Sequence, residues 1–205
     1  MKSRALRLCI LLVLLSFPSR AQERERRAYE GVVSLQKKTI GALILLEVNG
    51  DSVAGWIRLG KFVPIEGGTI SPERVEFQAA GNRYSIDERR GKISYSGPDG
   101  EGNRYIAPLS RLTGQLVELT EGEQFSGSSI AAMEVRGRRW NLAVGRPSLW
   151  KRQGPPFETF SRPEELLQRE ISVWVADAEQ RRGKIIVIEE PEGMDIPLKP
   201  PKKSK

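Results

Sequence analysis

Histidine is absent from this chain of 205 residues, and cysteine occurs once, at position 9. The chain therefore lacks the side chains that build serine and cysteine hydrolase triads, imidazole or thiolate zinc sites and histidine-ligated haem. Long apolar runs are also missing after the first 20 residues, so no later segment is apolar enough to span a bilayer as a helix. Carboxylate, lysine, serine and tyrosine chemistry remains, and no cofactor is expected.

The N-terminus has the three parts of a secretory signal peptide. A basic start that includes Lys2 precedes the apolar residues 8–15, and the small residues Ser19 and Ala21 stand at the positions that define a cleavage site. The apolar stretch is shorter than the ~20 residues of a membrane-spanning helix. The sequence predicts that residues 1–21 are removed by cleavage near Ala21. It also predicts a secreted or periplasmic mature protein without a transmembrane segment.

The excess of positive charge is concentrated at the two ends of the chain. The whole sequence has 33 Lys and Arg against 26 Asp and Glu, a formal net charge of +7. Four of these bases lie in the predicted signal peptide and four lysines lie in the last seven residues, which leaves 25 bases and 26 acids in the body of the chain. We expect no nucleic-acid partner, because such proteins carry a basic folded surface. Residues 191–205, rich in Pro and Lys, are predicted to form a disordered tail.

Short strand-like runs separated by Gly, Asn, Asp and Pro fill residues 28–120. Residues 40–48 are nearly all apolar and end at the pair Asn49-Gly50, which favours a type I′ hairpin turn. In the run that follows, Val53 and Ile57 lie on one face at a period of two. Nine runs of this kind predict a mainly β domain, an antiparallel meander that closes as a barrel or folds as a sandwich.

A smaller β-rich unit is predicted over residues 126–190. Its first two strands turn near Gly137. Ser161 and Glu164 occupy the two ends of an S-x-x-E capping box that has proline in the first turn. This motif predicts a short helix over residues 163–169.

The connection formed by residues 145–160 has the residue types of a binding surface. It gathers aromatic rings, cations and prolines. Connections longer than about 12–15 residues are often functional, and large aromatic residues and arginine are frequent interface anchors. We therefore take Trp150, Arg152, Phe157 and Phe160 as candidate ligand- or partner-binding residues. The alternative is that the rings pack onto the second unit as a lid or a seam between domains.

Three patterns that suggest catalysis or metal binding are incomplete. Ser34 and Lys37 fit S-x-x-K, but the accompanying S-D-N and K-T-G motifs are missing. Residues 99–103 alternate oxygen ligands as a calcium loop does, but the glycine and the acid that such a loop requires do not follow. Glu189 and Glu190 are neighbours on a strand and point to opposite faces. No catalytic residue and no metal ligand is therefore predicted.

Three stretches of turn-and-strand sequence carry a resemblance to known proteins: GDSVAG at residues 50–55, GTIS at residues 68–71 and VEF at residues 75–77. They resemble small secreted bacterial β-meander domains that are described as lipocalin-like. The resemblance implies an antiparallel β-barrel over about half of the mature chain, and it supplies no catalytic residues.

Two functions from different classes fit these observations. The first is a non-enzymatic binding or interaction protein of the bacterial cell envelope, with another envelope protein or an apolar small molecule as its partner. The second is a carboxylate-dependent hydrolase of envelope glycans, with a pair of acids brought together by the fold. We prefer the first, because the chain has no convergent catalytic motif. Its ligand and its oligomeric state are left open.

Overall fold

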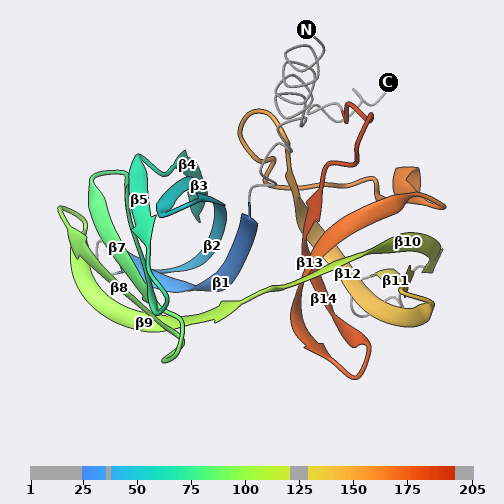
Figure 1. Ribbon diagram of the computed structural model, residues 1–205, viewed down its shortest axis with the longest axis horizontal. Coiled ribbons are helices and arrows are strands. Elements are labelled where there is room, and N and C mark those ends of the chain that lie inside the picture. Colours follow the sequence, from blue (N-terminus) through green and yellow to red (C-terminus); the bar gives the residue numbers. More distant parts are fainter. Residues whose placement is uncertain (1–24, 36–37, 121–128, 197–205) are drawn as a thin grey trace, which may run out of the picture.

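The computed structural model describes residues 25–35, 38–120 and 129–196. Within these ranges the chain is mainly β-strand and forms two barrels that lie side by side (Figure 1). Strands β1 to β9 build the first barrel, and β10 to β14 build the smaller second barrel. The predicted mainly β fold is confirmed. The predicted signal peptide and residues 197–205 lie outside the described residues.

The first barrel is an antiparallel meander closed by its first and last strands. The ring runs β1-β2-β3-β5-β6-β7-β8-β9, and β9 pairs with β1, while β4 pairs with β3 at the side. Of the two predicted forms, barrel and sandwich, the chain adopts the barrel. The strands are β1 Glu25–Leu35, β2 Lys38–Asn49, β3 Ser52–Leu59, β4 Lys61–Pro64, β5 Gly67–Ile70, β6 Arg74–Ala79, β7 Asn82–Asp87, β8 Lys92–Gly97 and β9 Gly100–Pro108.

Apolar side chains fill the interior of this barrel, because apolar and polar residues alternate along its strands. In β6, Val75, Phe77 and Ala79 are buried and the residues between them are exposed, because successive side chains of a strand point to opposite faces. The same pattern in the other strands turns a continuous set of apolar side chains inward, among them the stacked rings of Phe77 and Tyr84, whose centroids are 5.1 Å apart. The interior is therefore a packed core.

The hairpin between β2 and β3 is confirmed, but its turn is not of the predicted type. Asn49 pairs with Ser52, so the two loop residues are Gly50 and Asp51. Gly50 has a φ of 59°, whereas Asp51 is not among the residues with positive φ. A type I′ turn needs positive φ at both positions. Glycine with positive φ at the first loop position alone is typical of a type II′ turn. The loop begins one residue later than the Asn-Gly pair suggests, so Gly50 occupies the first loop position rather than the second.

The second barrel has a different topology. Around the ring its strands run β10-β11-β12-β14-β13, with β12 parallel to β14 and every other pair antiparallel. Five strands in the order 1-2-3-5-4, closed on strand 1 and with strands 3 and 5 parallel, have the topology of the OB-fold. The strands are β10 Ser110–Thr120, β11 Ser129–Val135, β12 Arg138–Trp150, β13 Glu170–Glu179 and β14 Arg182–Glu189.

Strand β10 belongs to this second barrel, whereas the sequence-based division at residue 120 places it in the first. Its first half pairs with β13 and its second half with β11. In Figure 1, β9 leads directly into β10 as the chain crosses from one barrel to the other. The chain therefore passes between the barrels at Leu109.

The predicted helix is reduced to a single 3-10 turn, Pro163–Leu166. Its N-cap is Arg162 rather than Ser161, and no side chain caps it. The turn places Leu166 in the core of the second barrel. The motif located the turn correctly, but four residues are too few to form an α-helix that would be stabilised by a capping box.

Candidate functional site: the cleft between the barrels

The structure places the four predicted binding residues in different environments. Strand β12 continues through Trp150, so residues 145–150 are strand rather than loop. Trp150 is 1% exposed and Phe160 is buried in the second core, against which Phe157 also packs. Arg152 is exposed. The three rings thus follow the packing alternative, and of the four residues Arg152 is the one that faces solvent.

The buried face of Trp150 belongs to an apolar cluster that joins the barrels, which we call the apolar seam. Its ring packs against Trp174 with the centroids 6.1 Å apart. First-barrel residues from β1 and β2 meet second-barrel residues from β12, β13 and β14 in this cluster. The apolar seam consists of Ala28, Leu43, Leu45, Leu109, Trp150, Trp174, Ile186 and Val187.

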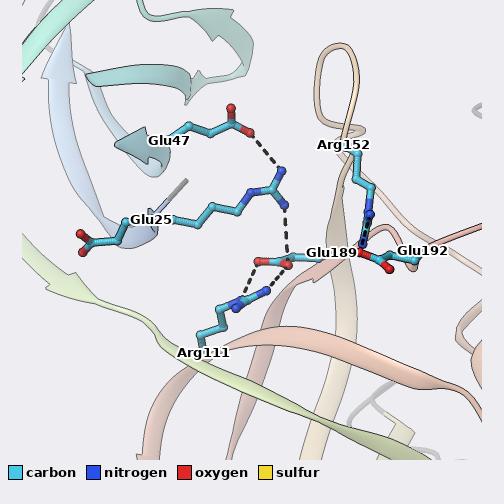
Figure 2. Close-up of a pocket in the computed structure, with 7 residues that line it drawn as sticks. Glu25, Glu47, Arg111, Arg152, Glu189 and Glu192 are labelled. Carbon is cyan, nitrogen blue, oxygen red and sulfur yellow. Dashed lines mark hydrogen bonds and ion pairs between the residues drawn. The ribbon is translucent and has the colours of Figure 1, made fainter. Parts of the chain in front are cut away.

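A cleft of about 630 Å³ opens between the barrels, and charged side chains line it (Figure 2). The first barrel contributes residues of β1 and β2, and the second contributes residues of β10, β14 and the segments after β12 and β14. We call this site the inter-barrel cleft. Its lining residues are Glu25, Arg26, Glu47, Arg111, Arg152, Glu189 and Glu192. A second hollow of about 480 Å³ shares four of them and extends along β10 and β13.

Glu189 is the most highly connected residue of the inter-barrel cleft. Arg111 donates to both of its oxygens, from Nε to Oε1 at 3.0 Å and from Nη2 to Oε2 at 2.8 Å. The indole Nε1 of Trp174 donates to Oε1 at 2.8 Å. The Glu189 side chain is 8% exposed. A buried carboxylate requires such partners to compensate its lost hydration, and the paired contacts from one guanidinium also fix its orientation.

Arg26 connects this carboxylate to the first barrel. Its guanidinium lies 3.0 Å from Glu47 of β2 and 3.6 Å from Glu189 of β14. The same group lies over the ring of Trp150, 4.7 Å from the ring centroid, in cation–π geometry. The Arg26 side chain therefore links the charged lining of the cleft to the apolar seam. Its contacts with Glu189 and with Trp150 join the two barrels.

The rim of the cleft is more accessible than its floor. The Arg152 side chain is 45% exposed and donates to Glu192 at 2.9 Å. The Arg111 side chain is 42% exposed even though it contacts Glu189. Beside the rim, Lys151 forms a buried ion pair with Glu190 and donates from Nζ to the carbonyl of Ile196 at 2.6 Å. Residues 191–196 are thereby held against the second barrel, although the sequence suggested that a disordered tail begins at 191.

The ionisation of Glu190 follows from these contacts. Burial by itself raises the pKa of its carboxyl group, but hydrogen bonds from Lys151 and from the backbone N–H groups of Arg152 and Ile196 favour the charged form more strongly. The pKa of Glu190 is therefore lowered. Glu189 and Glu190 serve separate partners, as their opposite orientation on a strand predicts.

The sequence did not identify the centre of this site. Arg111 and Glu189 are 78 positions apart, and nothing in the local pattern of either residue indicates the other. The glutamate pair at the end of a strand was noted, but its two carboxylates have different partners. The near-continuous apolar run that ends at a charged residue, Ile185–Ile188 followed by Glu189, could have indicated a strand end at an interface.

Within the part of the chain that the structure describes, no group of three or more His, Cys, Asp or Glu residues is arranged to hold a metal ion. Nor do the described residues include a helix with the length and hydropathy needed to cross a membrane. Comparisons with protein-family models, with curated proteins and with solved structures find no match to this chain.

Proposed function

We propose that this protein is a non-enzymatic binding protein of the bacterial cell envelope, and that it binds a charged polar segment of a partner in the inter-barrel cleft. The observation that carries the proposal is the lining of the cleft, where groups of both signs from two barrels face one space and two arginines stay accessible. The signal-peptide pattern of residues 1–21 supports the envelope location.

The packing of the two barrels favours a polar ligand over an apolar one. The interior of the first barrel is filled by its own side chains, and the rings expected to receive an apolar ligand are buried in the second core and in the apolar seam. A ligand of about the size of a short peptide fits a volume of 630 Å³, which lies in the ordinary range of binding sites.

The hydrogen bonds of Glu189 favour binding over hydrolysis. Both oxygens accept hydrogen bonds from Arg111 or Trp174, so both are already engaged as acceptors. A glycosidase needs a second carboxyl group that stays protonated and can donate to a leaving group. The other acids of the cleft, Glu25, Glu47 and Glu192, each contact an arginine, and Glu25 and Glu192 are exposed.

A ligand that satisfies both signs of charge at once is a peptide with alternating acidic and basic residues. Its carboxylates would meet Arg111 and Arg152, and its ammonium groups would meet the carboxylates of the rim. Charge complementarity of this kind determines specificity and association rate more than total affinity. A peptide of a single charge would meet repulsion from half of the lining.

Calorimetric titration with four eight-residue peptides tests the proposal: alternating Lys-Glu, all Glu, all Lys, and neutral Ser-Gly. We expect the alternating peptide to bind at least about 10-fold more tightly than the others. Arg152→Ala should weaken that binding about 5-fold, which corresponds to roughly 1 kcal/mol for an accessible charge. The matched control is Arg89→Ala, an exposed arginine of the first barrel paired with Glu73. No binding by any peptide, or equal binding to both variants, would refute the proposal.

A further inference from the structure

Seven exposed cations of the second barrel have no acidic partner within 4.0 Å among the described residues. Two of them, Arg146 and Arg169, lie elsewhere, and the other five lie at the ends of two hairpins, the β11–β12 hairpin and the β13–β14 hairpin. We call this group the cationic hairpin ends, and it consists of Arg136, Arg138, Arg181, Arg182 and Lys184. None of them lines the inter-barrel cleft.

The parallel pairing of β12 with β14 brings the two hairpin ends together. Asn141 is the register partner of Arg182, and its N–H donates to the carbonyl of Arg181 at 3.0 Å. Arg138 lies three residues before Asn141, so its Cα is roughly 10 Å along the strand from this contact. Lys184 follows Arg182 by two residues and shares its face of the sheet. Arg138, an odd number of residues from Asn141, points to the opposite face of the sheet. Because β12 and β14 are parallel, the two hairpins bring their cations to the same end of the second barrel.

Among the described residues, the acids near these cations do not neutralise their charge. Residues 134–141 and 177–184 together carry six bases and three acids. Glu179 is the register partner of Arg182, yet the two side chains form no ion pair. Residues 109–196 as a whole carry 12 bases and 14 acids. The second barrel is thus slightly acidic overall and polarised, with an excess of positive charge at the hairpin ends.

The residue types at this surface indicate what kind of polyanion fits it. Recognition of single-stranded nucleic acid relies on exposed aromatic rings on which bases stack. The aromatic residue of these hairpins, Trp140, packs against the second core. Arginine and lysine side chains without a stacking ring suit carboxylate or sulfate groups spaced along a flexible chain.

We infer that the cationic hairpin ends bind an acidic polysaccharide through its anionic groups. This binding is separate from the inter-barrel cleft in residues and in ligand chemistry. It places the second barrel against an anionic glycan while the cleft stays open to a polar segment. Attraction of this kind is long-ranged at low ionic strength and weakens as salt is added.

The test compares polygalacturonate, neutral dextran and a 20-nucleotide thymidine oligomer as ligands of the purified protein, at about 20 and 200 mM salt. The variant is the triple Arg138→Ala, Arg182→Ala, Lys184→Ala, since Arg136 and Arg181 have positive φ and are left unchanged. The matched control removes the same charge from exposed positions of the first barrel, with Lys61→Ala, Arg83→Ala and Lys92→Ala.

We expect polygalacturonate to bind the wild type in a salt-dependent manner and dextran not to bind. The triple variant should lose at least about 10-fold in affinity and the control less than about 2-fold. Arg152→Ala should leave polygalacturonate binding unchanged, which separates this inference from the function of the cleft. Should the triple variant unfold, Lys184→Gln gives the same comparison with a loss of about 3-fold. Equal losses in variant and control, no binding of polygalacturonate at 20 mM salt, or tighter binding of the oligonucleotide would overturn the inference.

Discussion

Glu189 receives hydrogen bonds from β10 and β13 and an ion pair from β1, so one side chain connects both barrels. Its burial is stabilising only while all these partners are present, because a buried charge without partners is strongly unfavourable. The exposed ion pairs of the first barrel, such as Arg89 with Glu73, do not have this property. At the scale of single residues, the assembly therefore depends on a few buried polar contacts rather than on the many charges of the surface.

The substitution Glu189→Gln tests this dependence. Glutamine keeps the shape of the side chain but cannot accept from Arg111 at both oxygens, and it leaves Arg26 and Arg111 with less compensation. We expect the free energy of unfolding to fall by about 3 kcal/mol, measured by urea denaturation. The comparison variant is Glu73→Gln, whose partner is exposed, and its change should stay within about 1 kcal/mol. Equal effects of the two substitutions would contradict this prediction.

The lowered pKa of Glu190 gives a pH-dependent prediction at the same scale. A carboxyl group whose pKa is lower in the folded state stabilises the protein above the ordinary pKa of glutamate, near 4.5, and this contribution is lost as the pH falls through the folded pKa. The destabilisation caused by Glu190→Gln should therefore be largest near pH 7 and shrink below about pH 4.5. Unfolding titrations of both proteins at several pH values measure this difference. A difference that does not change with pH would exclude the assigned role.

At the scale of elements, β10 shows what the strand pattern could and could not indicate. Its alternation predicted a strand, and the strand is present, but it pairs with β13 along one half and β11 along the other. Gly114 lies near the change of partner, where an added Cβ would be 2.2 Å from the carbonyl oxygen of Glu134. A register shift between Leu116 and Glu118 follows. A strand that serves two neighbours needs a close approach and a bulge, and neither is visible in the alternation.

Gly114→Ala tests the close approach. The methyl group would collide with the backbone of β11 and force the strands apart, so we expect a loss of about 2 kcal/mol or more in unfolding free energy. Gly145→Ala is the matched control, because nothing lies within 4 Å of an added Cβ at that position. Its effect should be within about 1 kcal/mol. Thermal and urea unfolding of the two variants compare them directly, and a neutral Gly114→Ala would show that the strands accommodate the methyl group.

At the scale of the whole molecule, the apolar seam and the inter-barrel cleft occupy the same junction. The seam removes apolar side chains of both barrels from water, and Arg26 joins it to the charged lining of the cleft. The geometry of the cleft therefore depends on the packing of residues that do not line it. Two barrels that share such a junction are expected to unfold together.

Trp150→Ala should uncouple the barrels. Removal of a fully buried indole costs about 3–5 kcal/mol and leaves a cavity in the seam, so the variant should be less stable and its thermal unfolding should broaden or divide into two transitions. Phe157→Ala is the comparison, since that ring is partly buried and packs within the second barrel alone. Differential scanning calorimetry distinguishes the outcomes. A single sharp transition in Trp150→Ala with unchanged stability would mean that the seam does not couple the barrels.

The sequence by itself determined the mainly β class, the meander of the first barrel and the turns near Gly50 and Gly137. These features depend on neighbouring residues, whose alternation and turn chemistry are local. Only the tertiary structure decided the closure of β9 on β1, the transfer of β10 to the second barrel and the burial of Trp150. It also brought Arg111 to Glu189 across 78 positions. Long-range pairing and burial depend on which surfaces of distant strands fit together. The alternation of apolar and polar residues along one strand does not specify which other strand pairs with it.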